Sequence, residues 1–228
     1  MQILFWFLFS LVLIFFNYQL WKVLAKDYDS QKVIVFSWLL VFFSWLGGRL
    51  WYGLANWGVW NQNWVDWLSW WNKSGFSWWG AYVFLVVFSL FFSKKNDWKW
   101  WNVIEDVIVV VLGASSWWLL VEWLKFRSSK GLVSLGIVLF VYLLSKWIKT
   151  KYRSFYWYKS GRKGFVFLFA NTLTFVLMFF LSILSLFPLK HQFLALGLGL
   201  IFGLGLFMLG SAKGKLLVWK RKNNEKED

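Results

Sequence analysis

Residues 165–187 read FVFLFANTLTFVLMFFLSILSLF, an apolar stretch without a single charged side chain. About 20 apolar residues in a helix cross the hydrocarbon core of a bilayer, so this stretch predicts a transmembrane helix. It ends at Pro188, the only proline. Hydropathy indicates six further spans, at residues 3–24, 33–57, 76–93, 102–121, 132–147 and 193–212. The sequence therefore predicts an all-α polytopic membrane protein with about seven transmembrane helices.

The composition excludes several classes of protein. Of the 228 residues 60% are hydrophobic, 25% are aromatic and only 15% are charged, against roughly 25% charged in a soluble domain. A soluble fold would expose a continuous apolar patch, so we exclude a soluble enzyme, a disordered chain and a disulfide scaffold. The chain has no cysteine and one histidine, His191. We therefore expect no cofactor and no metal.

The net charge of +15 could indicate a nucleic-acid partner, but the basic residues are distributed as membrane topology requires, so we expect none. Loops on the cytoplasmic side carry most of the Lys and Arg. Nineteen of the 25 follow the first, third and fifth segments or lie in the tail, and only Arg49, Lys73, Lys125, Arg127, Lys130 and Lys190 lie elsewhere. This bias predicts a bacterial-type cytoplasmic (inner) membrane, with the N-terminus outside and the C-terminus in the cytoplasm.

We expect one transmembrane helical domain over residues 1–212 and a basic, then acidic, cytoplasmic tail over 213–228. A Trp-rich arm at residues 57–74 joins the second and third segments. Its tryptophans are spaced by three and four residues and form one stripe on a helix: Trp57, Trp60, Trp64, Trp67 and Trp71. The stripe favours an anchor in the membrane interface; an arm that guides a lipid headgroup or a partner is the alternative.

Ionisable residues inside spans are functional candidates, because they are costly in lipid. Arg49 follows two glycines in the outer third of the second segment, and Glu122 lies at a similar depth in the fourth. Arg49 either pairs with Glu122 or binds a phosphate or carboxylate headgroup. Glu105 and Asp106 are expected in the first turn of the fourth segment, as dipole partners and caps or as functional groups.

The last segment is rich in glycine, and Gly199 and Gly203 have the spacing that lets helix backbones approach closely. Packing within the chain is the first interpretation. A dimer interface or a lipid groove is the alternative, and the oligomeric state stays open.

Three short motifs resemble one enzyme family. Residues 47–56, GGRLWYGLAN, resemble the Gly-Ala-Arg-Leu-Gly-Tyr stretch of prolipoprotein diacylglyceryl transferases. Residues 70–81 look like that family's segment Gly-Gly-aromatic-x-x-His-Gly-Gly. Residues 101–106 look like its helix start x-Asp-x-x-Ala-Pro. The resemblance covers residues 35–120, and the family's seven spans with an outer N-terminus also fit.

The resemblance implies transfer of a diacylglyceryl group from phosphatidylglycerol to a lipobox cysteine, with phospholipid and a lipoprotein precursor as partners. It implies a scaffold role for Asp106 and a headgroup role for Arg49. We expect the headgroup site to comprise Gly48, Arg49, Tyr52, Asn56, Gly80 and Glu122. Trp79 stands where the family has its histidine, and residues 113–118 lack the family's Arg and Asn. The identity of any catalytic residue therefore stays open. We expect this chain to be a divergent relative of the family, with degenerate key motifs. The alternative is a non-enzymatic phospholipid-binding or scaffold protein.

Overall fold

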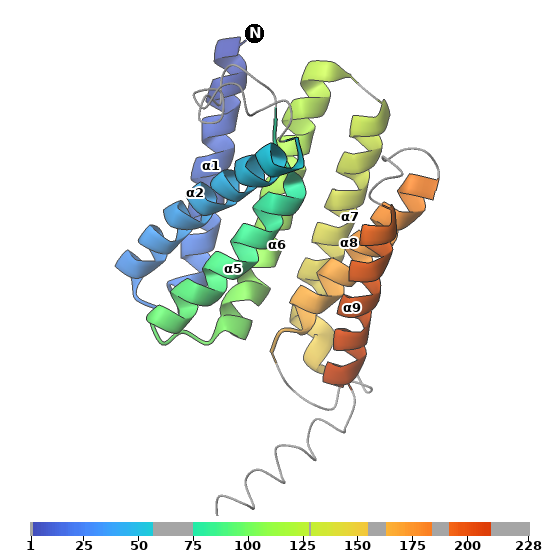
Figure 1. Ribbon diagram of the computed structural model, residues 1–228. Coiled ribbons are helices and arrows are strands. Elements are labelled where there is room, and N and C mark those ends of the chain that lie inside the picture. The colour runs from blue at the N-terminus through green and yellow to red at the C-terminus, as the bar shows by residue number, and fades with distance from the viewer. Residues whose placement is uncertain (1, 57–74, 128, 155–162, 184–191, 211–228) are drawn as a thin grey trace, which may run out of the picture. The chain divides into compact units, whose positions relative to one another are not determined.

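The structure, a computed structural model, describes residues 2–56, 75–127, 129–154, 163–183 and 192–210 (Figure 1). The predicted arm at 57–74, the tail, Pro188 and His191 lie outside these residues. All regular structure in the described ranges is helical: α1 (Gln2–Leu24), α2 (Ser30–Ala55), α5 (Trp78–Lys95), α6 (Trp100–Phe126), α7 (Ser129–Lys151), the 3-10 helix η1 (Tyr152–Ser154), α8 (Phe165–Ile183) and α9 (Gln192–Gly210).

The prediction of an all-α polytopic membrane protein is confirmed. Within the described residues, α1, α2, α6 and α7 are long and apolar enough to cross a membrane, and α8 and α9 contain shorter apolar stretches. Large apolar side chains remain exposed on these helices, as at Phe193 and Phe207. Such surface is stable against lipid tails and unstable in water.

Two helices are longer than their apolar runs. The fourth and fifth segments were expected at 102–121 and 132–147, but α6 has 27 residues and α7 has 23. Both helices continue past their apolar runs into charged residues, up to Lys151 in α7. Hydropathy detects only the length in contact with lipid, whereas the backbone hydrogen bonds of a helix continue as long as its ends are hydrated or packed.

Residues 17–104 form one compact unit, in which α2 and α5 pack side by side (Figure 1). Its core is aromatic and centres on Phe36, which is fully buried. The Phe36 ring lies 5.0 Å from Phe92 and 5.6 Å from Trp98. These contacts join the start of α2 to the end of α5 and to the turn that follows it.

Residues 1–16 and 105–228 form the other unit, in which α8 and α9 pack closely. Gly199 lies against Val176 and Phe175, and Gly203 lies against Thr172. As the residue numbers rise on α9 they fall on α8, so the two helices are antiparallel. Gly199 and Gly203 thus face α8 of their own chain.

Helix ends meet as the predicted alternation of loops requires. In one unit, Tyr28 before α2 stacks on Trp98 after α5, with ring centroids 4.5 Å apart. In the other, Asp106 near the start of α6 pairs with Lys149 near the end of α7. Loops assigned to one side of the membrane therefore lie together within each unit. Which side is cytoplasmic stays a prediction.

Candidate headgroup site and family

Arg49 joins the last third of α2 to the residues that precede α5. Its side chain is 7% exposed, and its Nη1 donates a hydrogen bond of 2.9 Å to the carbonyl oxygen of Gly75. Beside it, the backbone N–H of Ser77 donates to the carbonyl oxygen of Gly48 at 3.0 Å. These two bonds fix the start of α5 against α2.

Glycines allow this close approach. A Cβ atom on Gly80 would collide with the carbonyl oxygen of Gly47 and with the Cβ of Trp51, and one on Gly75 would collide with the ring of Tyr52. Only a residue without a side chain fits at these points. The predicted site residues Gly48, Arg49, Tyr52 and Gly80 therefore lie at one helix junction.

The same junction contains the N-terminus of α5. Ser77 is its N-cap, and the Ser77 side chain accepts from the backbone N–H of Gly80 at 3.5 Å. The first turn of a helix carries a partial positive charge. Together with the Arg49 guanidinium, this end of α5 favours an anionic group such as a phosphate.

Asn56 has a local role that the sequence did not indicate. It is the C-cap of α2, and both its backbone N–H and its Nδ2 donate to the carbonyl oxygen of Tyr52, at 3.1 and 2.8 Å. Its amide therefore ends the helix two turns beyond Arg49. Glu122 lies in α6, in the other unit, and its pairing with Arg49 stays a prediction.

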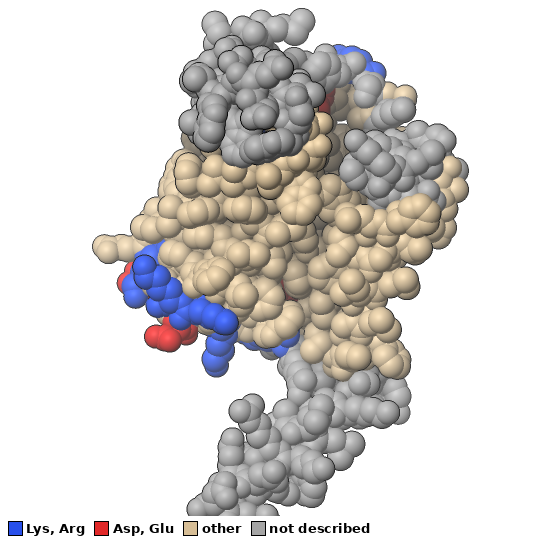
Figure 2. Space-filling model, in the orientation of Figure 1, with Lys and Arg blue, Asp and Glu red and all other residues tan. Residues whose placement is uncertain are grey.

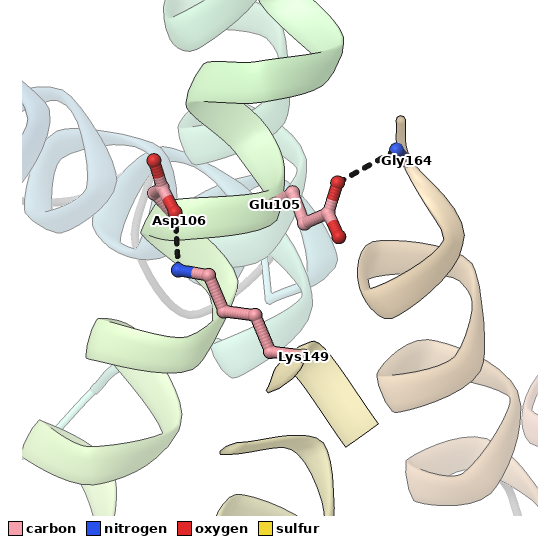
Figure 3. Close-up of polar contacts among 4 residues, drawn as sticks. All are labelled: Glu105, Asp106, Lys149 and Gly164. Carbon is pink, nitrogen blue, oxygen red and sulfur yellow. Dashed lines mark hydrogen bonds and ion pairs between the residues drawn. The ribbon is translucent and has the colours of Figure 1, made fainter. Parts of the chain in front are cut away.

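A second polar cluster lies near the start of α6 (Figure 3). The expectation that Glu105 and Asp106 occupy the first turn is wrong, because α6 begins at Trp100. Glu105 is 4% exposed, and its Oε2 accepts a hydrogen bond of 2.8 Å from the backbone N–H of Gly164. Asp106 leaves the helix on a different side and pairs with Lys149 of α7 (Figure 3).

These two neighbouring acids tie three helices together. Glu105 binds the backbone just before α8, where Gly164 has a φ of 104° that favours glycine. Asp106 binds α7, and the scaffold role that the resemblance implied for it stays a prediction. The two carboxylates bind partners outside α6. The described residues contain no group of three or more His, Asp or Glu that could hold a metal ion.

A family model described as prolipoprotein diacylglyceryl transferase matches residues 2–116. This range is just over half of the chain and contains the Arg49 junction, α5, Glu105 and Asp106. The chain belongs to the prolipoprotein diacylglyceryl transferase family. No curated protein and no solved structure matches it. The match ends within α6, so α7, α8, α9, Glu122, Gly199 and Gly203 lie outside it.

Proposed function

We propose that this diacylglyceryl transferase relative binds a phospholipid of the phosphatidylglycerol type, with the headgroup at the junction of α2 and α5. The observation that carries the proposal is the position of Arg49, a buried guanidinium inside a span, directly beside the N-terminus of α5. A charged side chain within a membrane span is costly, and a phosphate bound there would offset that cost by charge-assisted hydrogen bonds.

The headgroup site comprises Gly48, Arg49, Tyr52, Asn56 and Gly80, all in the unit formed by residues 17–104. In this site Arg49 contacts the phosphate, and the glycines let the lipid approach the backbone. Tyr52 and Asn56 flank it. The predicted topology places the site in the outer half of the cytoplasmic membrane, because α2 runs outward and Arg49 lies in its last third.

The reaction implied by family membership is transfer of the diacylglyceryl group to a lipobox cysteine of a lipoprotein precursor. A bond forms between the cysteine sulfur and the glycerol carbon, the bond from that carbon to the phosphate oxygen breaks, and glycerol phosphate leaves. The reaction needs a base for the thiol proton and a cation for the leaving phosphate. Arg49 supplies the cation, but Trp79 occupies the family's histidine position and cannot accept a proton.

The direct test of transfer uses the purified full-length protein. It is incubated with phosphatidylglycerol and a synthetic lipobox peptide, and mass spectrometry measures the diacylglyceryl-peptide and the released glycerol phosphate. An active enzyme gives both products in equal amounts and loses them in Arg49→Ala. Arg127→Ala is the matched control, because Arg127 is exposed. If the wild-type protein forms no diacylglyceryl-peptide, transfer is contradicted.

A non-enzymatic phospholipid-binding or scaffold protein is the second candidate, and Trp79 in place of the family's histidine favours it. A protein that binds lipid without transfer gives no peptide product but loses bound phosphatidylglycerol in Arg49→Ala. In a pure scaffold, Arg49→Ala changes neither the peptide product nor the bound lipid. Its scaffold function is lost instead when Gly199 or Gly203 is replaced by a large side chain. Peptide product and bound lipid, measured on the same preparations, separate the three cases.

A further inference from the structure

A second membrane-facing feature lies at the other end of α2. The short loop between α1 and α2 meets the turn between α5 and α6, because Tyr28 stacks on Trp98 with an interplanar angle of 28°. The Trp98 ring also contacts the ring of Phe92 at 5.3 Å, and its backbone N–H donates to the carbonyl oxygen of Ser93 at 2.8 Å. The two loops are therefore held as one surface.

This surface, the paired-loop surface, is basic. Six lysines, three from each side of the stack, belong to it, and all six side chains are exposed: Lys22, Lys26, Lys32, Lys94, Lys95 and Lys99. The two loops contain three acids, Asp27, Asp29 and Asp97, and the Asp29 carboxylate caps α2 by accepting from the N–H of Gln31. Within the described part of the chain, Lys149–Asp106 is the ion pair recorded, and it involves none of these six lysines.

The surroundings of the lysines indicate a lipid partner. Exposed aromatic rings, those of Tyr18, Trp21 and Trp101, lie at the same helix ends. Aromatic rings beside lysines at the ends of apolar helices mark the depth of the lipid headgroups. At the lower left of Figure 2, where Figure 1 places these loops, Lys and Arg gather with acidic side chains beneath uncharged surface.

We propose that the paired-loop surface is a composite site for the phosphates of an anionic phospholipid, with lysines of both loops binding one lipid. Because each loop supplies its own cluster of cations, the site favours a lipid with two phosphates, cardiolipin, over one with a single phosphate. It is separate from the Arg49 site. Arg49 follows Lys32 by 17 residues of α2, or about 25 Å of helix.

The test measures binding of cardiolipin and of phosphatidylglycerol to the full-length protein by native mass spectrometry, in detergent with neutral phosphatidylcholine as the competitor. The triple variant Lys32→Gln, Lys94→Gln, Lys95→Gln removes three charges from the paired-loop surface. The matched control Lys146→Gln, Lys151→Gln, Lys163→Gln removes three exposed charges of the other unit. We expect cardiolipin affinity to fall about tenfold or more in the first variant and less than twofold in the control.

A charge-preserving variant tests the composite nature of the site. Tyr28→Ala removes the stack on Trp98 and lets the loops separate, so cardiolipin affinity falls although every lysine remains, whereas Tyr28→Phe keeps the stack and the affinity. Equal losses in both triple variants would mean that diffuse charge attracts the lipid, and an unchanged affinity in Tyr28→Ala would mean that the loops act separately. Either result overturns the proposal.

Discussion

Gly80→Ala is expected to separate α2 from α5. The new methyl group would overlap the carbonyl oxygen of Gly47 and the Cβ of Trp51. Neither atom can move by rotation of a flexible side chain, so the two helices must shift. Two hydrogen bonds cross this junction, Arg49 to Gly75 at 2.9 Å and Ser77 to Gly48 at 3.0 Å, and a shift weakens both.

The size of the effect follows from three contributions. Overpacking against well-packed neighbours costs about 1–3 kcal/mol, and loss of the two hydrogen bonds costs about 1 kcal/mol each. The better helix propensity of alanine offsets at most about 1 kcal/mol. The net loss in the free energy of unfolding is about 2–4 kcal/mol, which lowers the midpoint of thermal unfolding by about 5–15 °C for a chain of this size.

The assay is thermal unfolding of detergent-solubilised protein, followed by the loss of monodisperse material in size-exclusion chromatography. Gly203→Ala is the matched control, because a Cβ there would lie 3.6 Å from Cγ2 of Thr172, an ordinary contact. The control should be as stable as the wild type or slightly more so. A Gly80→Ala protein that unfolds at the wild-type temperature, or a Gly203→Ala protein that is equally weakened, would refute the close contact at Gly80.

Three further predictions concern other parts of the chain. Glu105→Ala leaves the N–H of Gly164 without its partner and costs about 1.5–3 kcal/mol, whereas Glu105→Gln keeps an acceptor oxygen; thermal unfolding should rank Ala below Gln, and the reverse order contradicts the contact. Ser89→Ala removes the acceptor of the Trp100 indole N–H, 3.1 Å away, and should cost about 1 kcal/mol in the same assay; no loss of stability contradicts that bond. Because the chain has no cysteine, single cysteines at Asp97 and Arg127, beyond the two ends of α6, report the topology: an impermeant maleimide should label position 127 in intact cells and position 97 only after lysis, and the opposite pattern reverses the orientation.

The helices were predictable because their signal is local. Apolar runs located the seven α-helices that the described residues contain, and the start of α8 at Phe165 was predicted to the residue. The ends of α6 and α7 were missed because charged residues such as Lys149 and Lys151 continue a helix without adding hydropathy. Nothing in the amino-acid pattern marks a helix that continues beyond its apolar run.

The partners of the polar groups were not predictable, because they depend on packing between distant segments. Arg49 was expected beside a side chain or a ligand, yet it donates to the backbone carbonyl of Gly75, 26 residues away. Glu105 was expected to cap its own helix or to be a functional group, yet it accepts from Gly164, 59 residues away. Glycine was the available signal at both sites, since Gly75 and Gly164 lie where a backbone group must be approached closely or take a positive φ.

The measurement that tests the central claim most directly is the lipid that co-purifies with the protein. The wild type, Arg49→Ala, Arg49→Gln and Arg127→Ala are extracted gently from the same membranes, and bound phospholipid is quantified by mass spectrometry. Arg49→Gln retains N–H donors for Gly75 without the charge, so it tests binding in a folded junction. The proposal predicts bound phosphatidylglycerol in the wild type and Arg127→Ala and its loss from both Arg49 variants. Equal amounts of phosphatidylglycerol on all four proteins would contradict a headgroup site at Arg49.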